Sequence, residues 1–382
     1  MILRYLDFNK IQAFLFIILP PGIILNNLAE LVYSMTMKQS INNGYQILEY
    51  KNMEWGNKMC TAITYKTKNH YFGRNLDLEI SYNEKIIVTP RNYTFSFRKS
   101  KEIKKHYAMI GMGIVIGNYP LYFDASNEKG LSMAGLNFPE NADYKSEKEG
   151  FDNISPFEFI PWVLSQCANI HEVKELLKRI NLVSIHFSEE LPLSPLHWMI
   201  SDREESITAE CIKDGLKIYD NPVGVLANNP TFDMQMFQLN NYMHLSTKNP
   251  DNHFSKHLKL ETYSRGMGAM GLPGDLSSQS RFVKAVFTKM NSISGDSESE
   301  SISQFFHILE SVYQQRGCVL VNEDKYEITI YSSCCNTDRG IYYYKTYENS
   351  QITGVDMKKE NLEDDKLITY PLIKGQKINM QN

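Results

Sequence analysis

The 382 residues can bury a large core, either as one large domain or as two ordinary ones. The net charge of -4, with both signs interspersed, argues against a nucleic-acid-binding surface and against a polybasic membrane patch. The six cysteines include no CxxC pair and no His/Cys spacing typical of zinc, and they are too sparse for a disulfide framework. We therefore expect a reduced, cytoplasmic setting, no metal or other cofactor and no nucleic-acid partner.

The first 59 residues form a predicted N-terminal extension. Residues 11–25 are strongly apolar and follow Arg4 and Lys10, as in a signal peptide. A Pro-Pro-Gly break interrupts this run, which is shorter than the roughly 20 residues that span a bilayer, and no small-x-small cleavage site follows. Three interpretations stay open. The segment is upstream sequence read in frame, with Met59 as the true start, or a signal or anchor, or a propeptide. The first predicts a cytoplasmic protein, and a signal or anchor predicts a membrane or secreted one.

The chain from residue 60 opens with strands. Alternating apolar residues bounded by Asn, Gly, Pro or Lys predict an antiparallel sheet with strands at 61–65, 70–75, 85–88, 93–98 and 107–116. An apolar run at 120–123 leads into a turn-forming cluster at 124–130, after which 131–138 is predicted to be a strand.

Helices and strands then alternate in blocks. The spacing of apolar residues predicts helices at 156–167, 171–180, 231–242, 279–290 and 301–315, with 292–300 as a flexible connection. Further strands are predicted at 196–200, 206–212, 216–219, 223–226, 327–332, 340–346 and 351–356, with a turn that contains Cys334 and Cys335. Since no regular βαβ alternation occurs, we expect a single α+β domain over residues 60–382, with largely antiparallel sheets.

Cys60 is the first candidate for chemistry. A lone cysteine in a strand is most often a small buried hydrophobe. Cys60, however, follows an initiator-like Met59 and precedes Arg74 and Asp77 on the next predicted strand. A cation lowers the pKa of a thiol below its usual value of about 8.5. If Cys60 became an N-terminus, its α-amine, with a pKa of about 7.7 to 8.0, could act as the base for its own thiol.

Two rival interpretations have weaker support. Gly266, Gly268 and Gly271 form a GxGxxG pattern, but it follows Arg265 rather than a buried strand, and the Gly-Leu-Pro-Gly at its end cannot open a helix. A Cys-His protease is the other rival, although none of the nine histidines lies in a recognisable protease context.

Several motifs in order resemble the choloylglycine hydrolase family of N-terminal nucleophile hydrolases, which includes bile salt hydrolases and penicillin V acylases. The matching segments extend from residue 59 nearly to the C-terminus and are Met-Cys-Thr at 59–61, Gly-Arg-Asn-Leu-Asp at 73–77, Asn-Glu-Lys-Gly-Leu at 127–131, Ala-Gly-Leu-Asn-Phe-Pro at 134–139, Leu-His-Trp-Met-Ile-Ser-Asp at 196–202, Gly-Val-Leu-Ala-Asn-Asn-Pro-Thr-Phe at 224–232, Gly-Leu-Pro-Gly-Asp at 271–275 and Ser-Arg-Phe at 280–282. The resemblance implies a four-layer αββα fold with two stacked sheets.

The resemblance also implies roles for six residues. Cys60 would be the nucleophile and its freed amine the base. Arg74 would stabilise the thiolate, and Asp77 would orient the amine. The side-chain amide of Asn228 and the backbone N–H of Asn137 would form the oxyanion hole. Arg281 would complete the polar cluster.

The substrate expectation follows from the same resemblance. The family's pocket loops would place Leu76, Phe187, Leu191 and Leu196 around an apolar cavity suited to a steroid. We therefore expect hydrolysis of the amide between a bile acid and glycine or taurine, by a homotetramer. The alternatives are a penicillin V acylase or other N-acyl amide hydrolase, and a membrane-tethered, inactive binding protein with residues 1–58 intact.

Overall fold

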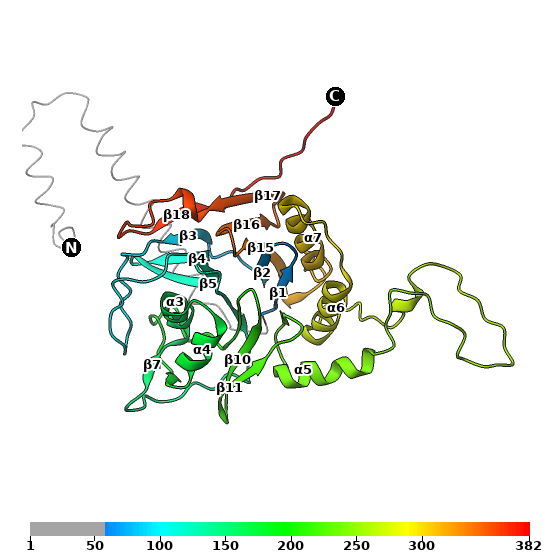
Figure 1. Cartoon of the computed structure of the whole chain (residues 1–382), viewed down its shortest axis with the longest axis horizontal. Coiled ribbons are helices and arrows are strands. Elements are labelled where there is room, and N and C mark those ends of the chain that lie inside the picture. The colour runs from blue at the N-terminus through cyan, green and yellow to red at the C-terminus, as the bar shows by residue number, and fades with distance from the viewer. Residues whose placement is uncertain (1–57) are drawn as a thin grey trace, which may run out of the picture. The chain divides into compact units, whose positions relative to one another are not determined.

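Two large antiparallel sheets organise residues 58–382, the part of the chain that the structure, a computed structural model, describes (Figure 1). The six-stranded sheet has the order β12 (Val225–Leu226), β1 (Cys60–Lys66), β2 (His70–Leu78), β15 (Ile328–Asn336), β16 (Ile341–Thr346) and β17 (Asn349–Asp356). The eight-stranded sheet has the order β11 (Gly215–Asp220), β10 (Ser206–Ile212), β9 (Leu196–Ser201), β6 (Ser132–Asn137), β5 (Tyr119–Asn127), β4 (Met109–Ile116), β3 (Lys85–Thr89) and β18 (Ile368–Pro371). Two small sheets pair β13 (Leu320–Asn322) with β14 (Lys325–Tyr326), and β7 (Asp152–Ile154) with β8 (Ile180–Leu182).

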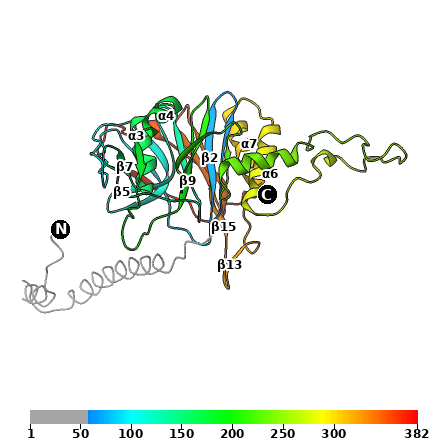
Figure 2. The ribbon, with the colours of Figure 1, turned by 90° about the horizontal axis from the view of Figure 1, so that it is seen from below.

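Helices cover the outer faces of both large sheets. α3 (Pro156–Gln166) and α4 (Ile170–Leu177) lie on the eight-stranded sheet, and α6 (Ser278–Asn291) and α7 (Glu298–Glu310) lie on the six-stranded sheet (Figure 2). α5 (Phe232–Gln238) and the 3-10 helix at Leu239–Tyr242 lead into a long arm that extends away from the sheets before α6 (Figure 1). Two further 3-10 helices span Met267–Ala269 and Met357–Lys359. The layers therefore run helix, sheet, sheet, helix, which confirms the predicted α+β, αββα fold.

The core consists of two clusters, and successive residues of a strand point alternately into one and the other. Ile86 and Val88 of β3 face the six-stranded sheet, whereas Ile87 packs in the second cluster with α3 and α4. On β9, Met199 packs in the first cluster and its neighbour Trp198 packs in the second. The central strands are covered on both faces, so β2 is buried along its whole length. The neighbouring strand β1, which begins at Cys60, is also buried over most of its length.

The predicted strand at 93–98 is wrong. The structure has only an isolated bridge between Phe95 and Ile103 there. Tyr93, Phe95 and Phe97 are nevertheless all buried, in the cluster shared with α3 and α4. Their alternation therefore reflects packing of aromatic rings rather than pairing in a sheet.

The prediction of a turn at 124–130 is also partly wrong, because β5 continues through Asn127. Its polar residues are satisfied inside the protein. Asp124 accepts hydrogen bonds from the hydroxyls of Tyr331 (2.7 Å) and Tyr342 (2.6 Å), and the Asn127 side chain donates to two carbonyls of the α3 end. Because the partners come from distant segments, local sequence does not predict them.

Three further predictions, all in the C-terminal part of the chain, differ from the structure. Cys334 and Cys335 lie inside β15, buried and paired with β16, and not in a turn. α7 begins within the predicted flexible connection, because Ser297 and Glu300 form a capping box that satisfies its first N–H groups. It ends at residue 310 rather than 315.

The apolar run at 11–25 and the first 57 residues of the predicted extension lie outside the described residues. The predicted domain boundary at Cys60 therefore stays a prediction. From residue 58 to the C-terminus, no helix has both the length and the apolar character needed to cross a membrane.

Candidate active site

Cys60 is the first residue of β1 and is only 3% exposed. It pairs with Leu76 on β2, so a residue two positions away, Arg74, points to the same face of the sheet. The Arg74 Nη2 atom lies 2.5 Å from the Cys60 Sγ atom. The antiparallel register of two adjacent strands thus brings a guanidinium onto the thiol.

Opposing effects act on the pKa of the Cys60 thiol. Burial raises it, the charge of Arg74 lowers it, and the pKa stays above its ordinary value. Arg74 is itself 1% exposed, and its other Nη atom donates to the carbonyls of Phe123 and Gly135. Burial lowers the pKa of the Arg74 guanidinium, but the neighbouring Cys60 and Asp124 raise it, and the pKa stays above its ordinary value. Arg74 is therefore a fixed positive charge beside the thiol.

Asp77 is a fully buried carboxyl on β2 near the Met59–Cys60 peptide bond. Its Oδ1 atom accepts a hydrogen bond from the Thr329 hydroxyl at 2.6 Å, and its backbone N–H donates to the Met59 carbonyl at 3.2 Å. Its Oδ2 atom is buried and has no hydrogen-bond partner in the described part of the chain. Burial, opposed by the charge of Arg281, raises the pKa of Asp77 from 3.8 to about 6.

Asn228 connects the remaining predicted residues. Its Oδ1 atom accepts the backbone N–H of Cys60 and an N–H of Arg281, both at 2.7 Å, and its Nδ2 atom donates to the Asn137 carbonyl at 2.7 Å. Because a guanidinium only donates, the oxygen of Asn228 must face Arg281 and its amide hydrogens must face Asn137. One of the two amide hydrogens is used in this way.

Arg281 approaches Cys60 from α6, on the helix-covered face of the sheet. Its Nη1 atom donates to the Cys60 carbonyl at 2.6 Å and to the Thr61 hydroxyl at 2.5 Å. The other five predicted site residues therefore gather around Cys60. Arg74, Asn228 and Arg281 contact it directly, Asn137 adjoins it through Asn228, and Asp77 binds the carbonyl of the preceding residue.

The residues before Cys60 lie within the same cluster. The Lys58 carbonyl accepts the Asn137 side-chain amide at 3.4 Å, and the Lys58 ammonium donates to the Tyr82 hydroxyl at 2.8 Å. The Met59 N–H donates to the Glu327 carboxylate. Burial and the charge of Asp77 raise the pKa of Glu327 to about 8. Sequence reasoning missed Lys58, Tyr82 and Glu327, since none belongs to a motif.

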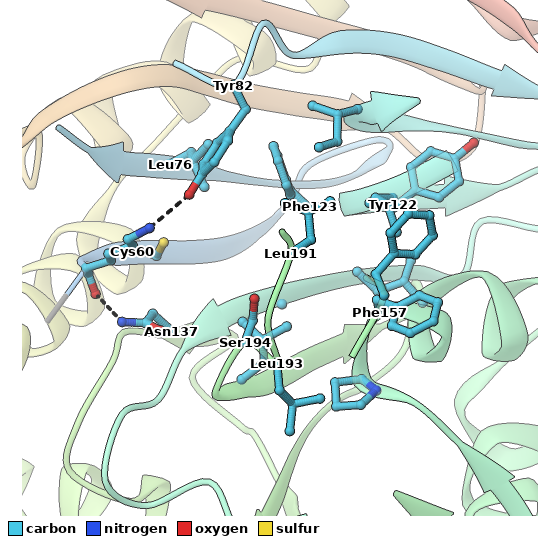
Figure 3. A pocket seen from close by; sticks show the side chains of 18 of the residues that line it. Cys60, Leu76, Tyr82, Tyr122, Phe123, Asn137, Phe157, Leu191, Leu193 and Ser194 are labelled. Atoms are coloured by element: carbon cyan, nitrogen blue, oxygen red, sulfur yellow. Dashed lines mark hydrogen bonds between the residues drawn. The ribbon is translucent and has the colours of Figure 1, made fainter. Parts of the chain in front are cut away.

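A mostly apolar cavity of about 1060 Å³, which includes its open mouth, leads to Cys60 and Arg74. The four residues predicted for the pocket, Leu76, Phe187, Leu191 and Leu196, all line it. Figure 3 shows Cys60, Leu76 and Asn137 at one end and Phe157 at the other. The missed lining residues include Tyr82, Tyr122, Phe123, Phe157 and Leu193. Aromatic residues in strands and helices are usually core, so no sequence signal marks them as pocket walls.

Neither a metal cluster nor a dinucleotide cradle is evident in the described region. Residues 58–382 contain no group of three or more His, Cys, Asp or Glu side chains placed to hold a metal ion. The GxGxxG pattern brackets a three-residue 3-10 helix, Met267–Ala269, that follows a left-handed Gly266, rather than a strand-to-helix turn.

Comparisons with known proteins agree with this geometry. The profile of the linear amide C-N hydrolases, choloylglycine hydrolase family, matches residues 60–370. A bile salt hydrolase/transferase of Lactiplantibacillus plantarum is 59% identical over 314 residues, which cover 82% of this chain and 97% of that protein. One from Clostridium perfringens is 43% identical over 329 residues, covering 85% of this chain and 100% of that protein.

Solved structures show the same fold. A variant of conjugated bile acid hydrolase from Clostridium perfringens, 42% identical, has a TM-score of 0.79 and covers 85% of this chain and 100% of that chain. Penicillin V acylase from Agrobacterium tumefaciens, 19% identical, has a TM-score of 0.63 over 83% of this chain and 92% of that chain, a likeness of fold alone. From the family match and the identity of these relatives, we conclude that the chain is an amide hydrolase that belongs to the choloylglycine hydrolase family.

Proposed function

We propose that the chain hydrolyses the amide bond between a bile acid and glycine or taurine, with Cys60 as an N-terminal nucleophile. The observation that carries the proposal is the apolar cavity that ends at the contact between the Cys60 thiol and Arg74. An apolar wall suits a steroid body, and the polar end suits the amide. The names of the Lactiplantibacillus and Clostridium relatives support the same substrate class.

The reaction proceeds in two steps. The free α-amine of Cys60 takes the thiol proton, and Sγ attacks the amide carbon to form a tetrahedral intermediate. The C–N bond then breaks, the amine leaves with the proton from the Cys60 ammonium, and the bile acid stays as a thioester. A water molecule gives a proton to the α-amine, its oxygen attacks the thioester, and the free acid leaves as the thiol is restored.

The surrounding residues have separate tasks in this scheme. Arg74 stabilises the thiolate through its contact with Sγ. Asn228 has a second amide hydrogen, which together with the backbone N–H of Asn137 stabilises the oxyanion. Asp77 accepts a hydrogen bond from the ammonium of Cys60 at Oδ2, the buried oxygen that has no described partner. Arg281 holds the Cys60 carbonyl and the Asn228 oxygen in place.

This mechanism requires cleavage of the bond between Met59 and Cys60, because the nitrogen of Cys60 is a peptide amide while Met59 precedes it. Lys58 also lines the cavity. We propose that residues 1–59 are absent from the active enzyme. With Met59 as the start, removal of one methionine in the cytoplasm produces the terminus.

The test uses protein that begins at Cys60, as verified by intact mass. Incubation with glycocholate, taurocholate and penicillin V, followed by mass spectrometry of the products, should show release of glycine and taurine. Cys60→Ala should stay folded and release neither. Cleavage of penicillin V alone would make the chain a penicillin V acylase instead, and turnover by Cys60→Ala would refute the mechanism.

We also propose that the enzyme assembles as a homotetramer. The arm between α5 and α6 exposes large apolar side chains, among them Phe254 at 82% and Tyr263 at 81%. Burying them against other copies removes them from water. Light scattering on the purified protein should give four times the chain mass, and a monomer mass would exclude this assembly.

A further inference from the structure

His197 forms a buried polar cluster on β9 that the proposed mechanism does not use. His197 and Glu210 of β10 are both 0% exposed. The Nδ1 atom of His197 lies 2.9 Å from the Glu210 Oε1 atom, and its Nε2 atom lies 2.8 Å from the Ala227 carbonyl oxygen. Both ring nitrogens therefore have partners.

The protons of this pair follow from its partners. A carbonyl oxygen only accepts, so Nε2 must carry a hydrogen toward Ala227. The contact of Nδ1 with Glu210 ties the ring to β10. Both oxygens of Glu210 also accept the N–H of Phe232, at 3.1 and 3.2 Å, where α5 begins. A polar pair whose hydrogen bonds are satisfied can stay buried, whereas the loss of one member leaves the other without its partner.

His197 touches a chain neighbour of each proposed oxyanion donor. Its ring stacks on Phe138, which follows Asn137, with centroids 4.2 Å apart and planes 7° from parallel. Its Nε2–H binds the carbonyl of Ala227, which precedes Asn228. A single rigid ring therefore spans the two segments that the bond from Asn228 Nδ2 to the Asn137 carbonyl joins.

The backbone N–H and carbonyl of Asn228 are also held by side chains. Its N–H donates to the Ser278 hydroxyl at 2.8 Å, and its carbonyl accepts the amide of Gln235. Ser278 lies on α6 and Gln235 on α5, so His197 supplies the contact from the eight-stranded sheet. His197 thus both binds the Ala227 carbonyl and stacks on the Phe138 ring.

We propose that His197, held by Glu210, is a positioning residue that aligns Asn228 and Asn137 for stabilisation of the oxyanion. The inference rests on the proposed function, in which these two residues donate to the developing negative charge. Loss of one such donor lowers kcat by about a hundredfold to a thousandfold. A shifted donor should cost less, so we expect a loss of about tenfold to a hundredfold.

The experiment compares three variants in protein that begins at Cys60. His197→Phe keeps an aromatic ring against Phe138 but removes both nitrogens. His197→Gln keeps an N–H donor that can reach the Ala227 carbonyl. His106→Phe is the matched control, because His106 is also a buried histidine with a partner at each ring nitrogen. Its partners are the backbone carbonyls of Tyr93 and Tyr107, and it lies outside the candidate active site.

Two kinetic measurements separate positioning from general damage. For glycocholate, His197→Phe should lower kcat by about tenfold to a hundredfold and change KM by less than about twofold, since His197 does not line the cavity. Alkylation of Cys60 by iodoacetamide, followed by peptide mass spectrometry, should keep its rate within about twofold, because it needs the thiolate and no oxyanion hole. His197→Gln should recover most of kcat, and His106→Phe should keep it.

Three results would overturn the inference. One is an unchanged kcat in His197→Phe, another is a parallel loss of kcat and alkylation rate, and the third is an equal loss in His106→Phe. If His197→Phe does not fold, Glu210→Gln applies the same test, with a smaller loss of kcat and unchanged alkylation. Wild-type kcat in that variant would also refute the positioning role.

A further measurement does not depend on the substrate. In protein labelled with 15N-asparagine, the side-chain amide resonance of Asn228 is assigned with Asn228→Asp. It should shift in His197→Phe and return toward its original position in His197→Gln. If wild-type protein releases no glycine or taurine, the proposed function fails while this resonance still tests the positioning. An unshifted resonance in His197→Phe refutes the inference alone.

Discussion

Asp77→Asn tests the electrostatics of the site through protein stability. Within residues 58–382, the Asp77 carboxyl accepts one hydrogen bond, from the Thr329 hydroxyl, and its second oxygen is buried without a hydrogen-bond partner. Burial raises its pKa from 3.8 to about 6 in the chain that retains Met59. At 1.36 kcal/mol per pKa unit, this rise corresponds to about 3 kcal/mol.

The sign of the effect follows from proton binding. A carboxyl whose pKa is higher in the folded state binds protons more readily when folded. The stability that this provides is complete below the unfolded pKa of 3.8 and is lost as the pH rises through about 6. In the chain with Met59 in place, the free energy of unfolding of wild type relative to Asp77→Asn should therefore fall by about 3 kcal/mol between about pH 3.5 and pH 7.

This fall in the free energy of unfolding of wild type relative to Asp77→Asn should shrink or reverse in protein that begins at Cys60. There the protonated α-amine supplies the missing partner of Asp77, and a nearby positive charge lowers the pKa of a carboxyl. Urea unfolding followed by circular dichroism measures both forms at the two pH values. Asp365→Asn, at an exposed carboxyl, is the control. The same pH-dependent difference with and without Met59 would show that Asp77 does not face the amine.

Three further predictions concern the thiol, the cavity and the sheet. Arg74→Leu should raise the pKa of the Cys60 thiol, because it removes the positive charge that lies against Sγ, as measured by the pH dependence of iodoacetamide alkylation; a profile that superimposes on wild type contradicts the assigned contact. Leu191→Ala should raise KM for glycocholate by about tenfold with little change in kcat, because it removes apolar contact in the cavity; steady-state kinetics that show a lower kcat at constant KM would argue against this wall. Gly73→Ala should destabilise the protein by more than about 3 kcal/mol, since the new Cβ would lie 2.0 Å from the Ser333 carbonyl oxygen; an unchanged thermal midpoint would contradict this close approach of β2 and β15.

Most of the regular structure could be predicted because it has a local cause. β1, β2, β4 and β9 show the alternation of strands, and α3 and α6 show helical spacing, so each lies where its pattern predicts it. Two of the errors arise where distant residues override the local pattern. The aromatic alternation around Phe95 packs against helices instead of pairing, and polar Asp124 stays in a strand because two tyrosine hydroxyls reach it.

The candidate site could likewise be predicted only in part. Motifs spread over more than two hundred positions predicted Cys60, Arg74, Asn228 and the other site residues, although no single motif was specific. Their roles stay proposals, but the structure places all six together. Tyr82, Glu327 and His197 escaped prediction as part of this cluster, because what distinguishes them is which atoms they face.

Sequence by itself determined the cysteine after a methionine, the order of the motifs, the α+β class and the apolar character of the four predicted pocket residues. Only the tertiary structure decided that Arg74 reaches the thiol, that one oxygen of Asp77 has no hydrogen-bond partner among residues 58–382, and that the cavity ends at Cys60. Residue types and spacing specify local periodicity. Contacts between residues far apart in the chain depend on how two sheets stack, and burial in that stack is what sets the pKa values and pairings of the site.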